Sequence, residues 1–195
     1  FWYIPLHDDI ISVGVVAAFD YLFKNRDSKE LEDIYFEEVS RCPGLQPRIK
    51  DAERCDIFRA QKEYSYRAKK AAGDGWTLVG DAFGFLDPLY SSGVLLALVS
   101  GARAADAVAD GLAAGDTSES ALRQWEPDYI KAMDRMRRLV CEFYDGFSFG
   151  EFIRRHPEKK GLVTDVLIGN LFKDELDELW PLMDQMRAEK QSAAL

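Results

Sequence analysis

The segment from Trp76 to Val94, WTLVGDAFGFLDPLYSSGV, is the feature that most constrains how this chain can fold. It begins with large apolar and β-branched residues, passes through a stretch rich in glycine and proline, and continues into an alanine- and valine-rich stretch that reaches about Gly111. This order predicts a buried strand over 76–79, a loop, and a long helix after Gly93. We therefore expect a strand, a loop and a helix in succession, as in α/β folds.

The end of the predicted strand indicates a ligand site. A strand that ends in Gly80-Asp81 places a carboxylate just beyond the carboxyl edge of its sheet, where ligands bind in open α/β sheets. Gly80 lets a ligand approach the backbone closely. Asp81 is then placed to accept hydrogen bonds from a sugar or polyol hydroxyl.

The start of the predicted helix favours an anion. Because Ser91-Ser92-Gly93 precede the helix, unpaired backbone N–H groups and about half a positive charge from the helix dipole face whatever lies there. A reduced flavin and a halide ion both match that requirement. Pro88 would fix the chain direction beside a flat ring without adding a donor.

Each feature taken alone also fits ordinary structure. Gly80-Asp81 and Asp87-Pro88 can be simple turns, and Ser91-Ser92 can be a helix cap. Their order within one short segment makes the functional interpretation the more specific one.

The rest of the chain predicts small antiparallel elements followed by helices. Segments 1–5 and 10–16 form a hairpin, a helix begins at the Asp27–Glu30 capping pair and ends at Pro43-Gly44, and short strands lie at 57–58 and 63–67. From about Ser118 onward the chain is helical, with breaks at 146–150 and near 156–157.

Composition excludes several classes of function. With 25 basic and 34 acidic residues the net charge is −9, so nucleic acid and anionic lipid are not expected partners. The longest apolar stretch is far shorter than the ~20 residues of a membrane span. The three cysteines have neither CxxC spacing nor a histidine partner, so we expect no metal site, no disulfides and a cytoplasmic location. A first residue other than Met suggests that an upstream portion is missing.

At this point the chain resembles a known family. Gly80-Asp81-Ala82, Asp87-Pro88 and Ser91-Ser92-Gly93-Val94 look like the second flavin-binding motif of p-hydroxybenzoate hydroxylase-type flavoproteins, in the form found in flavin-dependent halogenases. The resemblance implies that Asp81 binds the ribityl chain of FAD and that Pro88 lies next to the isoalloxazine ring. It also implies that the amides of Ser92 and Gly93 hold a halide beside the flavin.

Two further segments strengthen the resemblance. Trp2, Ile4 and Pro5 fit the last positions of the halogenase motif WxWxIP, which places them with Tyr90 in the expected substrate pocket. Segments 143–150, 154–157 and 167–170 resemble the C-terminal helices of halogenases grouped with the chloramphenicol-pathway enzyme. Tryptophan halogenases have a glutamate where this chain has Tyr90, which favours phenolic, pyrrolic or carrier-bound aromatic substrates over free tryptophan.

The family implies partners and residues that the chain does not itself contain. A halogenase uses reduced FAD, O2 and chloride or bromide, and a separate flavin reductase supplies the reduced cofactor. The fingerprint GxGxxG is absent, and the family's catalytic lysine is expected upstream, because Lys69 and Lys70 lie on a predicted, solvated strand. Residues 1 to 195 alone are therefore expected neither to retain FAD nor to halogenate.

These observations predict a mixed α/β (α+β) chain that forms the C-terminal part of a p-hydroxybenzoate hydroxylase-like FAD-binding fold. Residues 1–72 are expected to belong to a substrate-binding sheet with one helix, 73–115 to the FAD-binding domain, and 116–195 to a helical region. Two alternatives remain open. One is a flavin monooxygenase or geranylgeranyl-reductase-like flavoprotein without halide chemistry, and the other is a non-catalytic interaction module.

Overall fold

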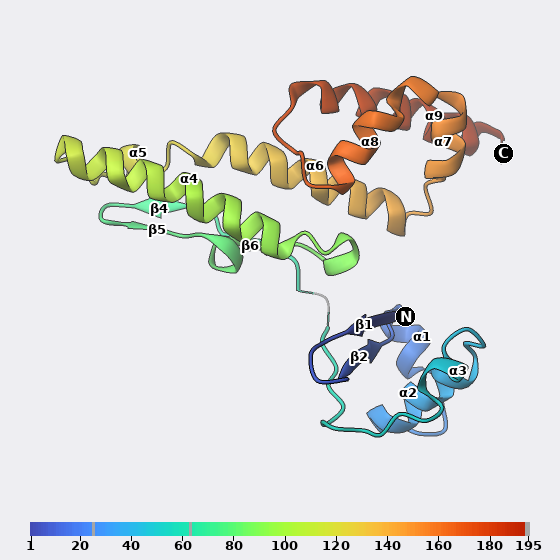
Figure 1. The fold of residues 1–195 in the computed structure, drawn as a ribbon. Coiled ribbons are helices and arrows are strands. Elements are labelled where there is room, and N and C mark those ends of the chain that lie inside the picture. The colour runs from blue at the N-terminus through green and yellow to red at the C-terminus, as the bar shows by residue number, and fades with distance from the viewer. Residues whose placement is uncertain (25, 63, 194–195) are drawn as a thin grey trace. The chain divides into compact units, whose positions relative to one another are not determined.

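The computed structural model describes residues 1–24, 26–62 and 64–193. Its contacts divide the chain into two compact units, Phe1–Glu63 and Tyr64–Leu195 (Figure 1). The strand predicted at 63–67 begins at residue 63, which lies outside the described residues.

The first unit opens with the predicted hairpin. Strand β1 (Trp2–Pro5) pairs antiparallel with β2 (Ile11–Gly14), in a register that sets Trp2 opposite Gly14. Asp8 and Asp9, at the turn, adopt left-handed φ angles of 54° and 56°. Short polar side chains tolerate that conformation better than most, so the polar turn suits the hairpin.

Three helices complete this unit: α1 (Phe19–Phe23), α2 (Leu31–Ser40) and α3 (Gln46–Ile49). The predicted capping pair at 27 and 30 is wrong, because α2 begins at Leu31 and the Glu30 N–H donates to Ser28 Oγ over 3.1 Å. The predicted strand at 57–58 is also absent. Phe58 instead packs its ring 5.2 Å from that of Tyr35 on α2.

The second unit begins with short antiparallel pairs. Strand β3 (Tyr66–Arg67) pairs with β6 (Gly84–Phe85), and β4 (Ala72–Gly73) pairs with β5 (Trp76–Thr77). The predicted buried strand over 76–79 is wrong. Only two of its residues form a strand, and Trp76 is 46% exposed, since its ring lies across Gly73 of the partner strand instead of entering the core.

Long helices make up most of this unit, as predicted. After the 3-10 turns η1 (Gly80–Ala82) and η2 (Pro88–Tyr90) come α4 (Gly93–Ala114), α5 (Glu119–Leu122) and α6 (Glu126–Tyr144). The C-terminal region holds α7 (Phe149–Arg155), η3 (Pro157–Lys159), α8 (Lys160–Leu167), η4 (Asp174–Glu178) and α9 (Leu179–Ala193). The expected breaks at 146–150 and 156–157 are confirmed by the ends of α6 and α7.

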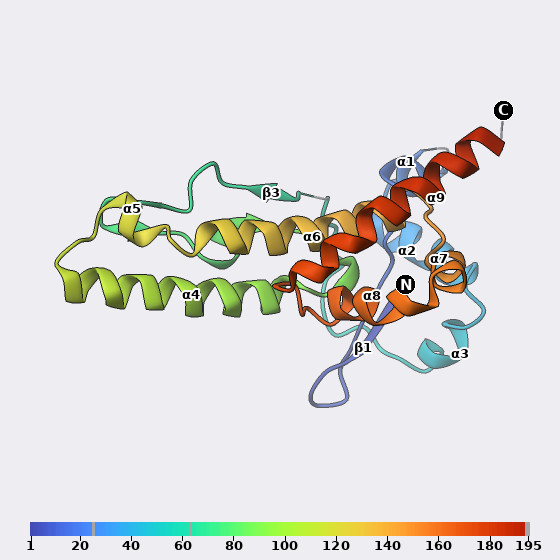
Figure 2. The same ribbon diagram turned by 90° about the horizontal axis from the view of Figure 1, so that it is seen from above.

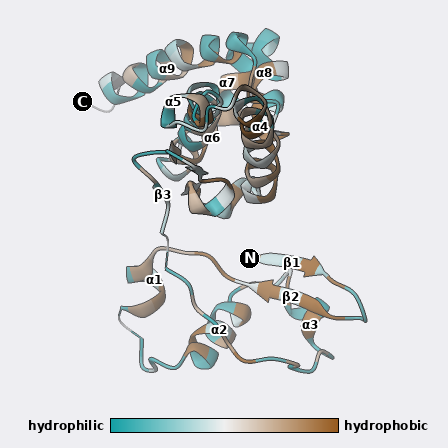
Figure 3. Ribbon diagram, turned by 90° about the vertical axis from the view of Figure 1, so that its left-hand side faces the viewer, coloured by the Kyte–Doolittle hydropathy of each residue, from teal (hydrophilic) through white to brown (hydrophobic). Residues whose placement is uncertain are grey.

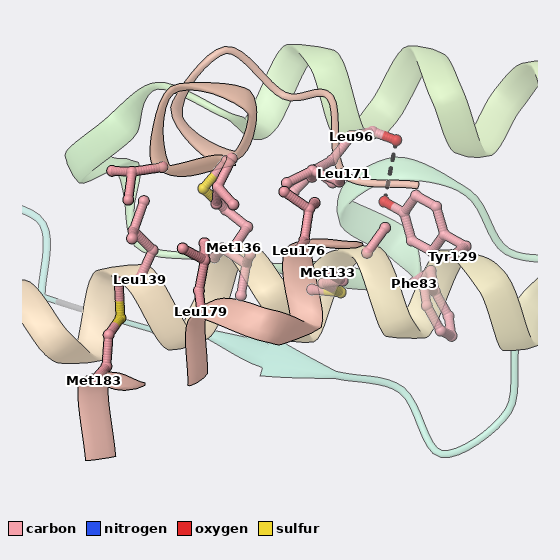
Figure 4. Close-up of a cluster of buried hydrophobic side chains, with 14 of the residues drawn as sticks. Phe83, Leu96, Tyr129, Met133, Met136, Leu139, Leu171, Leu176, Leu179 and Met183 are labelled. Carbon is pink, nitrogen blue, oxygen red and sulfur yellow. Dashed lines mark hydrogen bonds between the residues drawn. The ribbon is translucent and has the colours of Figure 1, made fainter. Parts of the chain in front are cut away.

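The core of this unit lies along α6. Helices α4 and α6 run side by side in opposite directions (Figures 1 and 2). α4 is predominantly apolar, whereas much of α9 is polar (Figure 3). The buried side chains that join α6 to its neighbours are shown in Figure 4: Phe83, Leu96, Tyr129, Met133, Met136, Leu139, Leu171, Leu176, Leu179 and Met183.

An ion pair between a buried arginine and a partly exposed aspartate ties α6 to the C-terminal region. Arg135, which is 4% exposed, donates from Nε and Nη2 to both Asp177 carboxylate oxygens over 2.8 and 2.7 Å, and from Nη1 to the Leu171 carbonyl over 2.7 Å. These hydrogen bonds from Arg135 hold the pKa of Asp177 well below its usual range.

Among the described residues, no helix combines the length and apolar character needed to cross a membrane.

The Arg135–Asp177 pair predicts a pH-dependent stability. A lowered folded-state pKa stabilises the protein above the unfolded value of about 3.9, and this contribution is lost as the pH falls through the folded value. Asp177→Asn should therefore lower the free energy of unfolding by about 1 kcal/mol at pH 7, since the carboxylate is partly exposed. Urea unfolding should show the difference from the parent protein narrowing toward pH 3. A difference in the free energy of unfolding that stays constant with pH would contradict this. So would an equal loss of stability in Asp110→Asn, which changes an exposed carboxylate.

Candidate functional site

Gly80 anchors the segment that the sequence analysis singled out. It adopts a φ of 54°, and a Cβ at this position would lie 3.2 Å from the Cβ of Ala97 on α4. Its buried N–H donates to Ser100 Oγ over 2.9 Å. Only glycine satisfies both the left-handed backbone and the close approach to α4. The loop is therefore fixed to the side of the helix about one turn beyond its start.

Asp81 follows directly, within η1 and exposed to solvent. Its backbone carbonyl accepts a hydrogen bond from the Tyr66 hydroxyl. In the part of the chain that the structure describes, its carboxylate takes part in no hydrogen bond or ion pair. A fixed backbone thus presents a carboxylate whose oxygens remain able to accept hydrogen bonds from a ligand. Burial, and then the negative charge of Asp81, raise the pKa of nearby Tyr129.

The Asp87–Tyr90 turn is held by its own cap and by α6. Asp87 Oδ1 accepts a hydrogen bond from the Leu89 N–H over 2.9 Å. The interpretation of Asp87-Pro88 as an ordinary turn is therefore confirmed. The same oxygen accepts from the Tyr144 hydroxyl over 3.0 Å. Pro88 is exposed at the first position of η2, where its missing N–H leaves no unmet backbone bond.

Tyr90 is half-buried at the end of the same turn. Its ring meets that of Phe143 edge-on, with centroids 6.2 Å apart, and it packs against the main core. Burial raises the pKa of its hydroxyl, which keeps the phenol neutral. Tyr90 therefore serves partly as a packing residue between η2 and α6.

The start of α4 has backbone donors ahead of its first intrahelical bond. Ser91 adopts a left-handed φ of 53°, and the bond from Leu96 N–H to the Ser92 carbonyl, 2.9 Å, is the first of the helix. Ser92 occupies the N-cap position, as the simple N-cap interpretation predicts, but its buried side chain makes no capping hydrogen bond. Gly93 has open space where a Cβ would lie, and Val94 is 74% exposed.

The structure brings together some of the predicted residues and places others in a separate unit. Gly80, Asp81, Pro88, Tyr90 and the 91–94 segment all lie in unit Tyr64–Leu195, whereas Trp2, Ile4 and Pro5 lie on β1 of the first unit. Trp2 is 40% exposed and donates from its indole N–H to Ser12 Oγ over 3.1 Å. Ile4 is 50% exposed, so the outer face of this strand is open to further contacts.

Two residues that hold the segment were not predicted from the sequence: Tyr66 and Ser100. They bond to the backbone of Asp81 and Gly80, and a backbone contact leaves no motif in the sequence. The buried position of Ser100 at helical spacing from Leu96 and Ala104 was the one available signal, since a serine in an apolar helix face calls for a polar partner.

The donor set suits the sugar and ring end of a flavin. An exposed carboxylate with free acceptor capacity matches a polyol chain, and the N–H groups at the start of α4 match a negative ring edge or an anion. The lysines Lys69 and Lys70 lie after β3, not on a strand, and are solvated as expected; Lys70 pairs with Glu119 over 2.7 Å. No cluster of metal-ligating side chains occurs among the described residues.

Comparison with known proteins identifies the family. The profile of the tryptophan halogenase family matches residues 1–148. The chain belongs to the tryptophan halogenase family. The predicted mixed α/β fold with small antiparallel strands and a helical C-terminal region is thereby confirmed.

Several relatives are named as halogenases. The chain is 34% identical over 189 residues, 95% of its length, to the 1H-pyrrole-2-carbonyl-[peptidyl-carrier protein] chlorinase of Pseudomonas fluorescens, and these residues cover 40% of the chlorinase. It is 35% identical over 145 residues to the tryptophan 2-halogenase of Chondromyces crocatus, with 74% of this chain and 28% of that protein covered. The chain thus spans well under half the length of these relatives.

A solved structure shows the same fold. The flavin-dependent brominase Bmp2 superposes with a TM-score of 0.79 at 28% sequence identity, over 98% of this chain and 48% of the brominase. The match extends across nearly all of both units. The expected resemblance to flavin-dependent halogenases is confirmed.

The close fit of Gly80 against α4 can be tested by substitution. Gly80→Ala adds left-handed strain and crowds Ala97, so it should lower the free energy of unfolding by about 1–3 kcal/mol. Gly75→Ala is the matched control, because Gly75 also has a positive φ of 76° but open space around its Cβ position. Urea unfolding should show a larger loss for Gly80→Ala. Equal losses would mean that the approach to α4 is not tight.

Proposed function

We propose that this chain provides the ribityl and ring end of an FAD site in a flavin-dependent halogenase. The observation that carries the proposal is the Asp81 carboxylate, which is exposed and unpartnered among the described residues while its backbone is fixed on both sides. When bound in its reduced form, FAD would supply the electrons with which O2 is reduced. Membership of the tryptophan halogenase family supports this cofactor.

In this proposal, each residue of the segment has a distinct role. Asp81 accepts hydrogen bonds from ribityl hydroxyls, and Gly80 keeps that backbone against α4. Pro88 borders the ring, and Ser91, Ser92, Gly93 and Val94 bring the start of α4 to the ring edge. The amides of Ser92 and Gly93 hold the halide, chloride or bromide.

The proposed substrate is an electron-rich aromatic, either a small molecule or one bound to a carrier. Trp2, Ile4, Pro5 and Tyr90 form the proposed substrate-pocket set. Relatives that are named for halogenating a pyrrole on a peptidyl-carrier protein support this class. A separate flavin reductase supplies reduced FAD, and the free cysteines at 42, 55 and 141 support a cytoplasmic location.

The same proposal assigns domains along the chain. Residues 73–115 belong to the FAD-binding domain, 1–72 to the substrate-binding region and 116–195 to the helical region. Support comes from the position of the motif segment, which lies between the short strands and α4. The catalytic lysine and the pyrophosphate-binding turn belong to other parts of the complete protein.

Loss of the Asp81 carboxylate tests the flavin assignment. A charge-assisted hydrogen bond contributes roughly 1.5–3 kcal/mol, so Asp81→Ala in the complete protein should weaken FAD binding about ten- to a hundredfold. Titration with FAD, followed by flavin fluorescence, measures the affinity. Asp110→Ala removes another exposed carboxylate of the same unit and should leave affinity unchanged. An unaltered affinity in Asp81→Ala would refute the assignment.

The halide site can be tested at Gly93. Gly93→Pro removes one N–H, and it also disturbs Ser92, whose φ of −81° and ψ of −12° a following proline disfavours. Gly93→Ala retains the N–H and fits the open space, and Ser92→Ala retains its own N–H. Halide-dependent turnover should therefore fall by about tenfold or more in the proline variant only.

Two outcomes would change the roles proposed for these residues. Equal losses in Gly93→Pro and Ser92→Ala would indicate a role for the serine side chain instead of the amides. Product formation that does not depend on halide would favour the flavin monooxygenase alternative.

A further inference from the structure

We propose that Ser100 is a positioning residue for the Asp81 carboxylate, acting through the Gly80 N–H. This inference rests on the proposed flavin site and names a residue, outside the motif, on which that site depends. Ser100 itself touches neither the proposed ligand nor the Asp81 side chain. Its effect passes through one hydrogen bond to the backbone.

The Ser100 hydroxyl occupies a fixed position in the core. The side chain is completely buried, and Oγ lies 2.9 Å from the Gly80 N, 2.9 Å from the Leu96 carbonyl and 3.0 Å from the Ala97 carbonyl. A hydroxyl has one proton, so Ser100 donates to the helix carbonyls and accepts from Gly80. The helix therefore sets the direction in which the hydroxyl presents its lone pair.

The hydrogen bond to Ser100 Oγ holds the backbone of Gly80, the residue before Asp81. Gly80 is buried with a φ of 54°, and the loop backbone approaches α4 so closely that a Cβ there would lie 3.2 Å from the Cβ of Ala97. The peptide N–H of Gly80 therefore needs an acceptor on the helix surface, and Ser100 is the one it uses. Because Asp81 is the adjacent residue and Tyr66 holds its carbonyl, these two hydrogen bonds fix the backbone from which the carboxylate extends.

The buried face of α4 is apolar apart from one serine. It consists of Leu96, Ser100, Ala104 and Gly111, and an alanine in place of Ser100 would fit the same volume without burying a hydroxyl. The Tyr129 hydroxyl of α6 bonds to the Leu96 carbonyl over 3.0 Å (Figure 4) and also interacts with the Ser100 hydroxyl. Among the described residues, Ser100 provides the side-chain acceptor for the Gly80 N–H.

The test is a double-mutant cycle on FAD affinity in the complete protein, with oxidised FAD as the probe. Asp81→Ala, Ser100→Ala and the double variant are compared with the parent protein at a temperature well below unfolding. Ser100→Ala should weaken FAD binding by about tenfold. In the Asp81→Ala background the same change should weaken it by less than about threefold, because Ser100 acts through Asp81.

Val166→Ala is the control for a loss of stability. Val166 is fully buried in α8 and belongs to the same hydrophobic core, and its apolar side chain forms no hydrogen bond with Gly80 or Asp81. It should lower the temperature of unfolding as Ser100→Ala does, yet leave FAD affinity within about twofold of the parent. The visible circular dichroism of bound FAD should change in Ser100→Ala and not in Val166→Ala, since it reports the surroundings of the ring.

Each other outcome overturns the inference. An unchanged affinity in Ser100→Ala, additive losses in the cycle, or an equal loss of affinity in Val166→Ala would show that Ser100 only stabilises the fold. If Asp81→Ala itself has no effect, the proposed function fails and this inference fails with it. Should Ser100→Ala not fold, Ser100→Cys keeps a weaker acceptor of similar size and should bind FAD with lowered affinity; the affinity of the parent protein would then overturn the inference.

Discussion

The Tyr129 hydroxyl, 3.0 Å from the Leu96 carbonyl, and the apolar side chains around it hold α6 against α4, and the rest of the second unit is arranged around that contact. Farther along α6, Arg135 reaches the Leu171 carbonyl and the Asp177 carboxylate in the C-terminal region. At its end, the Tyr144 hydroxyl holds Asp87. One amphipathic helix thus fixes a second helix, the C-terminal helices and the loop of the candidate site.

This arrangement shows how helices of the described chain hold a short loop in place. In the described chain, the strands next to the motif are two residues long, so they cannot hold the loop through a ladder of hydrogen bonds. Gly80 is held instead by a side chain of α4, and Asp87 by a side chain of α6. The two ends of the segment are therefore set by helices whose separation the core determines. A site on such a support has a defined geometry before any ligand binds.

Most of the helices could be predicted from the sequence, because their apolar spacing, glycines and prolines are local signals. The strand predicted over 76–79 was wrong. The hairpin of two-residue strands places the Trp76 ring across Gly73, and a run of apolar residues alone does not reveal which of its side chains enter the core. Asp81 was found through its motif. Ser100 was missed, because a serine in an apolar helix carries no sign of its partner until the fold brings Gly80 beside it.

In the proposed function, the segment from Gly80 to Val94 binds the ring and ribityl end of FAD. Hydrogen–deuterium exchange of the complete protein, with and without saturating FAD, tests it most directly. Binding should slow exchange of the amides at 80–94, above all those of Asp81 and of Gly93 and Val94 at the start of α4, with little change in exposed parts of α9. Protection elsewhere in the protein, with exchange over 80–94 unchanged, would contradict the account.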